Sequence, residues 1–172
     1  WIYTTYVQIL YRYGLRFTSD PEIIKDCIQE VFTSLYKNRN SLITPDNIKV
    51  YLFVSVKNCL IRTLYKESFY DRELPENIQF SLESTVEEDF INNEQYANQQ
   101  KMINEILALL TPRQKEIIYY RFIQELSMDE ICILMNLNYQ SAQNLIQRSL
   151  KKVRQNYDSI EVFLLILAIS LK

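Results

Sequence analysis

Apolar residues recur at the spacing of α-helices through the first part of the chain, with polar residues between them. The pattern opens with Tyr6, Ile9, Leu10, Tyr13 and Phe17. A second helix is predicted to follow, because Asp20 can cap it and Pro21 fits its first turn. Its apolar stripe consists of Ile24, Cys27, Ile28, Val31, Phe32 and Leu35. A third helix, predicted from about residue 47 to 67, is apolar on two opposite sides, which is typical of a central helix in a bundle.

Two capping boxes predict helix starts in the last third of the chain. Thr111 stands three residues before Gln114, and Ser127 three residues before Glu130, so each pair can satisfy two backbone N–H groups. Asn136 separates the last two helices, where a left-handed residue is needed and Asn tolerates that conformation. The last helix is predicted to bury Ala142, Leu145, Ile146, Ser149 and Val153. This order predicts a helix-turn-helix whose second helix enters the major groove of DNA.

The chain is predicted to be all-α, with two small helical domains over residues 1–67 and 101–157. Residues 68–100 lack a sustained apolar period and carry eight Asp and Glu against one Arg, which indicates an acidic linker. Residues 158–172 form an apolar tail that is too short to cross a bilayer as a helix. Two readings of the tail stay open, namely packing on the second domain or binding a partner.

Composition and charge exclude several classes of function. A single Gly excludes Gly-rich phosphate-binding loops, and the absence of His removes the usual general base and the commonest metal ligand. No enzymatic activity, metal or cofactor is therefore expected. The three cysteines, Cys27, Cys59 and Cys132, lie far apart at apolar helical positions, which indicates buried reduced thiols and a cytoplasmic location. The net charge of −2 is unevenly distributed along the chain. Residues 1–67 carry a net charge of +3, residues 68–100 carry −7, residues 101–154 carry +3 and the remaining residues carry −1.

The exposed face of the last predicted helix has the chemistry of base recognition. Gln and Asn can pair with adenine through two hydrogen bonds, and Arg can do so with guanine. The candidate residues for base and groove contacts are Gln140, Ser141, Gln143, Asn144, Gln147, Arg148 and Lys151. Lys151, Lys152 and Arg154 suit phosphate contacts, which position a helix without reading sequence.

Three segments give the chain a specific resemblance. The segment from Asp26 through Gln29, Glu30 and Phe32 to Tyr36 looks like the helix of sigma-70 family factors that grips the clamp of bacterial RNA polymerase. Residues 51–58 are similar to the segment that follows it, and residues 110–131 resemble the opening of the family's fourth region. With only these two regions and a connector, the chain resembles an extracytoplasmic-function (ECF) sigma factor.

The resemblance implies sites and partners. It implies that core RNA polymerase binds Asp26, Gln29, Glu30 and Thr33, and that the last helix reads the −35 promoter element. The residues implied for the melted −10 element are Lys49, Lys57, Asn58, Arg62 and Lys66. The implied partners are core polymerase, promoter DNA and an anti-sigma factor, which in this group is often membrane-borne, with no small-molecule substrate.

Several features leave more than one interpretation. Tyr51, Phe53, Tyr65 and Phe69 could receive unstacked bases, although core packing explains Tyr51 and Phe53 at least as well. The acidic linker is either a plain tether or a mimic of RNA in the polymerase channel. Family members commonly carry an acidic residue where this chain has Arg62 and an Arg where it has Tyr65, which leaves the −10 specificity open.

Two other functions remain as alternatives. One is a stand-alone transcriptional regulator in which residues 1–67 serve dimerisation or sensing; it should bind a two-fold DNA site without polymerase. The other is a helical interaction protein with a vestigial DNA motif, which predicts no salt-dependent DNA binding at all.

Overall fold

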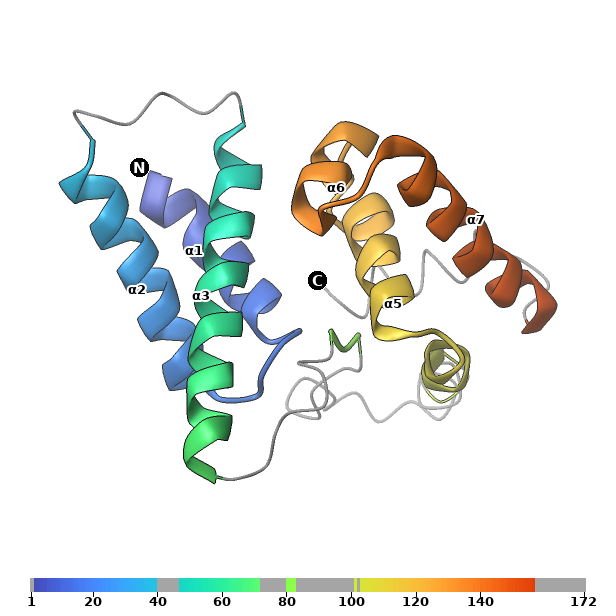
Figure 1. Ribbon diagram of the computed structural model, residues 1–172, viewed down its shortest axis with the longest axis horizontal. Coiled ribbons are helices and arrows are strands. Elements are labelled where there is room, and N and C mark those ends of the chain that lie inside the picture. Colours follow the sequence, from blue (N-terminus) through green and yellow to red (C-terminus); the bar gives the residue numbers. More distant parts are fainter. Residues whose placement is uncertain (1, 40–46, 72–79, 83–100, 102, 157–172) are drawn as a thin grey trace. The chain divides into compact units, whose positions relative to one another are not determined.

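Helices account for all the regular structure in the residues that are described. The computed structural model describes residues 2–39, 47–71, 80–82, 101 and 103–156 (Figure 1). The chain divides into two compact units, Trp1–Gln79 and Phe80–Lys172. This confirms the predicted all-α fold with two helical domains. Within the described ranges, none of the helices has the length and apolar character needed to cross a membrane.

The first unit is a bundle of three helices that all contact one another, α1 (Ile2–Gly14), α2 (Pro21–Lys37) and α3 (Ile48–Asp71). Helix α2 begins as predicted: Asp20 caps it by accepting hydrogen bonds from the N–H groups of Glu22 (2.8 Å) and Ile23 (3.4 Å). Asn47 caps α3 in the same manner, accepting from the N–H groups of residues 49 and 50. Local side chains therefore define where both helices start.

The core of the first unit is built from one face of each helix. Its buried apolar residues are Leu10, Tyr13, Ile24, Cys27, Ile28, Val31, Val50, Leu52, Phe53, Val56, Cys59 and Leu60. Val50 is buried on the second apolar side of α3, whereas Val54 and Ile61 are half-buried. The only Gly of the chain, Gly14, lies where α1 ends against Ile24 of α2.

The second unit contains α5 (Pro112–Ile118), a π-helical turn η2 (Tyr119–Ile123), α6 (Met128–Met135) and α7 (Tyr139–Asn156), preceded by helical residues 103–108. Both predicted capping boxes are present. The Gln114 N–H donates to Thr111 Oγ1 (3.3 Å) and the Thr111 N–H to Gln114 Oε1 (3.1 Å). The Glu130 N–H donates to Ser127 Oγ (3.3 Å) and the Ser127 N–H to Glu130 Oε2 (2.7 Å). Helix α7 contacts both α5 and α6.

Residues 80–82 belong to the core of the second unit. The side chains of Phe80 and Leu82 are only 3% and 1% exposed. The Phe80 ring lies 5.4 Å from the ring of Tyr119 and 6.2 Å from that of Tyr120, both of which are buried in η2. The Phe80 ring therefore packs against the π-helical turn.

Two boundaries differ from the predictions. Helix α3 continues to Asp71 instead of ending near residue 67. The predicted linker of residues 68–100 thus begins with helix and contains Phe80 and Leu82, which pack in the second unit. Residues 83–100 of the predicted acidic linker, for which RNA mimicry is one interpretation, lie outside the described residues, as does the apolar tail of residues 158–172.

Candidate nucleic-acid interface

Helix α7 separates a polar face from a buried one. Ala142, Ser149 and Val153 are fully buried, at a spacing of seven and four residues that keeps them on one side of the helix. Gln140, Asn144, Gln147 and Lys151 follow the same spacing on the opposite side. Gln143, Arg148 and Ser141 flank that line. All seven residues predicted for the −35 element thus lie on the half of α7 that faces away from Ala142; Ser141 and Asn144 are half-buried and the other five are exposed.

The charge of α7 suits a polyanion. The helix carries Arg148, Lys151, Lys152 and Arg154, and it contains no acidic residue. Arg148, Lys151 and Arg154 are exposed. Cations near the helix C-terminus also offset the negative end of the helix dipole. No side chain of α7 would therefore repel a phosphate that approaches its basic residues.

The turn before α7 is built by two asparagines. Asn136 adopts the left-handed conformation that the sequence predicts, with φ 49° and ψ 55°. The following Leu137 N–H donates to the Cys132 carbonyl (3.0 Å), which closes α6. Asn138 Oδ1 accepts from the Ser141 N–H (2.8 Å) and so caps α7. Arg113 of α5 donates to the Met135 carbonyl (3.2 Å) and ties the end of α6 to the preceding helix.

Two polar side chains of α7 are held by protein contacts. Gln140 Nε2 donates to Asn144 Oδ1 (3.0 Å), which aligns these two candidate base readers one turn apart. Lys152 Nζ donates to the Leu109 carbonyl (3.0 Å), 43 residues earlier in the chain. The sequence-based expectation that Lys152 lies on phosphate is therefore not matched by its position, since its ammonium binds the end of the helical residues 103–108.

In the first unit, the four residues predicted for polymerase contact lie together on α2. Asp26, Gln29, Glu30 and Thr33 are all exposed. They line one shallow depression together with Ser34, Lys37 and Asn38. We call Asp26, Gln29, Glu30 and Thr33 the α2 face.

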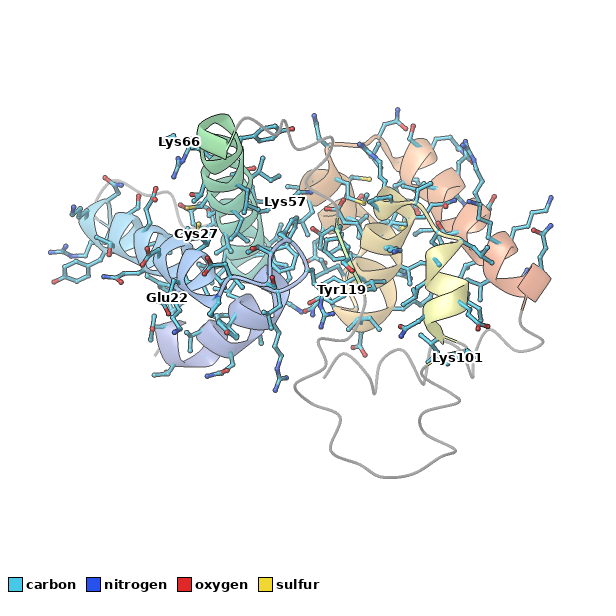
Figure 2. All side chains as sticks on the ribbon, turned by 90° about the horizontal axis from the view of Figure 1, so that it is seen from below. Glu22, Cys27, Lys57, Lys66, Lys101 and Tyr119 are labelled. Atoms are coloured by element: carbon cyan, nitrogen blue, oxygen red, sulfur yellow. The ribbon has the colours of Figure 1, made fainter. Side chains whose placement is uncertain are left out.

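The residues predicted for the −10 element do not share one side of α3. Asn58, Arg62 and Lys66 follow at intervals of four and lie on one exposed side. Lys57 projects from another side of the helix, as Figure 2 shows by comparison with Lys66. Lys49 lies near the start of α3 with its ammonium 5.9 Å from the centre of the Phe53 ring. We call Asn58, Arg62 and Lys66 the α3 face.

The α2 and α3 faces meet at an ion pair. An amino group of Arg62 donates to Glu30 Oε1, and Cys59 Sγ donates to Glu30 Oε2 at 3.5 Å. The hydrogen bond from Arg62, followed by that from Cys59, lowers the pKa of Glu30, and the bond to Glu30 raises the pKa of Arg62. Two residues that the sequence assigned to different partners are therefore bound to each other.

The aromatic residues of α3 divide between core and surface. Phe53 is fully buried, with its ring 4.4 Å from that of Tyr13, so packing in the core accounts for it. Tyr51 is half-buried and lines a pocket of about 130 Å³ with Glu30, Asn58 and Arg62. Tyr65 is 47% exposed. The side chain of Phe69 lies outside the described ones.

Two of the three thiols are buried as predicted. Cys27 and Cys59 are 2% and 4% exposed, whereas Cys132 is half-buried. Burial, followed by the neighbouring Cys27, raises the pKa of Cys59 to about 12. In Figure 2, Cys27 lies where α2 and α3 meet. The Cys59 thiol is therefore a protonated packing group at neutral pH.

Sequence reasoning missed Asn138 and the partner of Arg62. Asn138 could have been found, because an Asn directly before the first residue of a helix, here Tyr139, is a capping signal. The pairing of Arg62 with Glu30 joins residues 32 positions apart, and no local pattern indicates it.

Two helical units with an exposed basic helix after a left-handed turn define a helix-turn-helix DNA-binding protein with an additional helical bundle. The sequence matches Sigma-70 region 2 over residues 2–69 and Sigma-70 region 4 over residues 100–153. The chain belongs to the sigma-70 family of RNA polymerase sigma factors, and its succession of regions 2 and 4 is that of the ECF group. This assignment does not favour the stand-alone regulator.

The fold is also that of a solved sigma factor. The chain is similar to the sigma factor RpoE from Bartonella quintana, whose co-crystal structure contains the anti-sigma factor NepR. The TM-score is 0.63 at 13% sequence identity, over 90% of this chain and 93% of that chain. No curated protein matches the sequence.

Proposed function

We propose that the chain directs core RNA polymerase to promoters with defined −35 and −10 elements, and that it assists promoter melting. The single observation that carries this is the division of α7, whose buried side packs in the second unit while its polar side is free of acids. Such a helix can enter the major groove and place Gln, Asn and Arg on base edges. Membership of the sigma-70 family supplies the polymerase as partner.

The first unit would supply the other two contacts. The exposed α2 face offers two carboxylates and two neutral polar groups, which suit a complementary basic surface on the polymerase. The α3 face, with Arg62 and Lys66, suits the backbone of an unpaired strand. Lys57 and Lys49 lie outside the α3 face and would contact the −10 region from other directions.

The protein would act in the cytoplasm, where polymerase and promoters are, and would perform no chemistry itself. An anti-sigma factor is a further proposed partner. The support is that the structurally similar RpoE is described in complex with the anti-sigma factor NepR. A membrane-borne form of such a partner remains part of the proposal.

Binding of the purified chain to bacterial core RNA polymerase tests the polymerase contact. The wild type should bind, and the Asp26→Ala/Gln29→Ala variant should bind at least about fivefold more weakly, because central interface residues carry most of the binding energy. Gln8→Ala is the matched control, since Gln8 is an exposed helical Gln of the same unit outside the α2 face. Failure of well-folded wild type to bind core polymerase would remove the proposal.

A further inference from the structure

Glu30 belongs to the α2 face, and Arg62 belongs to the α3 face. Both carboxylate oxygens of Glu30 are occupied, Oε1 by Arg62 and Oε2 by the Cys59 thiol. The same amino group of Arg62 also lies 3.6 Å from Cys59 Sγ, so the side chains of Glu30, Cys59 and Arg62 all contact one another. As long as the pair is closed, Glu30 and Arg62 neutralise each other.

The pair is accessible and weak enough to exchange partners. The side chain of Arg62 is 53% exposed and that of Glu30 is 60% exposed. Ion pairs in this setting add little stability, because water screens them and ordering two long side chains has an entropic cost. A basic group of a protein partner can therefore replace Arg62 at Glu30, and a phosphate can replace Glu30 at Arg62.

We propose that the Glu30–Arg62 pair couples polymerase binding to binding of the −10 strand. A polymerase cation that takes Glu30 releases Arg62 toward the DNA backbone, and a phosphate that takes Arg62 releases Glu30 toward the polymerase. This inference rests on the proposed function of the two faces. Because either event opens the same pair, each favours the other, and the coupling is reciprocal. An exposed pair limits the effect to about two- to fivefold in affinity.

The first experiment measures the dissociation constant of the full chain for core polymerase. Arg62→Gln should tighten binding about two- to fivefold, because Glu30 no longer has an internal cation and keeps only the Cys59 thiol. Lys66→Gln is the matched control, since it removes the same charge from the same side of α3, one turn later. In a Glu30→Gln background, Arg62→Gln should have no larger effect than Lys66→Gln. Glu30→Gln keeps an oxygen acceptor for the Cys59 thiol.

The second experiment measures binding of the free chain to single-stranded oligothymidylate at fixed salt. Glu30→Gln should raise the affinity about two- to fivefold, and this gain should vanish in the Arg62→Gln background. If wild type binds polymerase but Arg62→Gln changes the dissociation constant for polymerase no more than Lys66→Gln does, the coupling is overturned and the proposed function stands. If folded wild type does not bind polymerase, the proposed function and the coupling both fall.

Discussion

Gly14 is the residue that lets α1 and α2 approach each other. A Cβ built at this position would lie 2.5 Å from Ile24 Cγ2 and 3.0 Å from Ile24 Cγ1. Ile24 is fully buried and β-branched, so its side chain cannot turn away without leaving its rotamer. The backbone of Gly14 has an ordinary negative φ, and the requirement is therefore one of space.

Gly14→Ala should destabilise the first unit by about 1–3 kcal/mol, the usual cost of overpacking a core. Urea unfolding followed by circular dichroism measures this, with Gln8→Ala on the same helix as the control. Adding Ile24→Ala should lower the cost of the Gly14 substitution, since it removes the clashing atoms. Unchanged stability of Gly14→Ala would show that the helices can separate freely.

The Cys59 thiol makes stability depend on alkaline pH. Its pKa is raised to about 12 in the folded state, first by burial. The thiol of an unfolded cysteine has a pKa of about 8.5. Between these values the folded chain binds more protons than the unfolded chain, so this stabilising contribution is lost as pH rises. Urea unfolding at pH 8 and pH 10.5 should show a smaller loss for Cys59→Ala than for wild type. If wild type and Cys59→Ala lost the same stability between these pH values, the Cys59 thiol would not be the cause.

At the scale of elements, α7 has base-reading and phosphate-binding candidates at separate positions. Arg148 and Lys151 are both exposed on its polar side. Arg148→Ala should reduce discrimination between a cognate and an altered −35 sequence by about 1–3 kcal/mol, as expected for one lost base contact. Lys151→Ala should instead weaken binding to both sequences equally. It should also reduce the slope of log binding constant against log salt concentration by about one, because one phosphate contact is lost. Titration of holoenzyme against both DNAs at several salt concentrations checks this; equal effects of the two variants would contradict it.

The elements of the second unit show which local features sequence could predict. Both capping boxes and the left-handed Asn136 were predicted correctly, because each is satisfied by residues within a few positions. The π-helical turn Tyr119–Ile123 was not predicted, nor was the positive φ of 55° at Glu125 that follows it. Glu125 has no sequence feature that favours this conformation, and Arg121 donates to the Leu126 carbonyl (2.9 Å) across the turn.

At the scale of the whole molecule, Phe80 and Leu82 assign part of the predicted linker to the second unit. Phe80→Ala should therefore destabilise that unit by about 3–5 kcal/mol and leave the first unit unchanged. Hydrogen exchange read separately for residues 2–39 and 103–156 measures the two effects, with Glu105→Ala, at an exposed position of the same unit, as the control. Equal loss of protection in both ranges would contradict the assignment.

The amino-acid sequence was sufficient to predict the all-α fold, the capped starts of α2, α5 and α6, the polar face of α7 and the family. These features depend on periodicity and on contacts over three or four residues, which a sequence displays directly. Three contacts became visible once the helices were placed in space: Glu30 binds Arg62, Lys152 binds the Leu109 carbonyl, and Phe80 packs on Tyr119. Each of these contacts joins residues more than 30 positions apart. Whether such side chains meet depends on how the helices pack, and no local pattern encodes that.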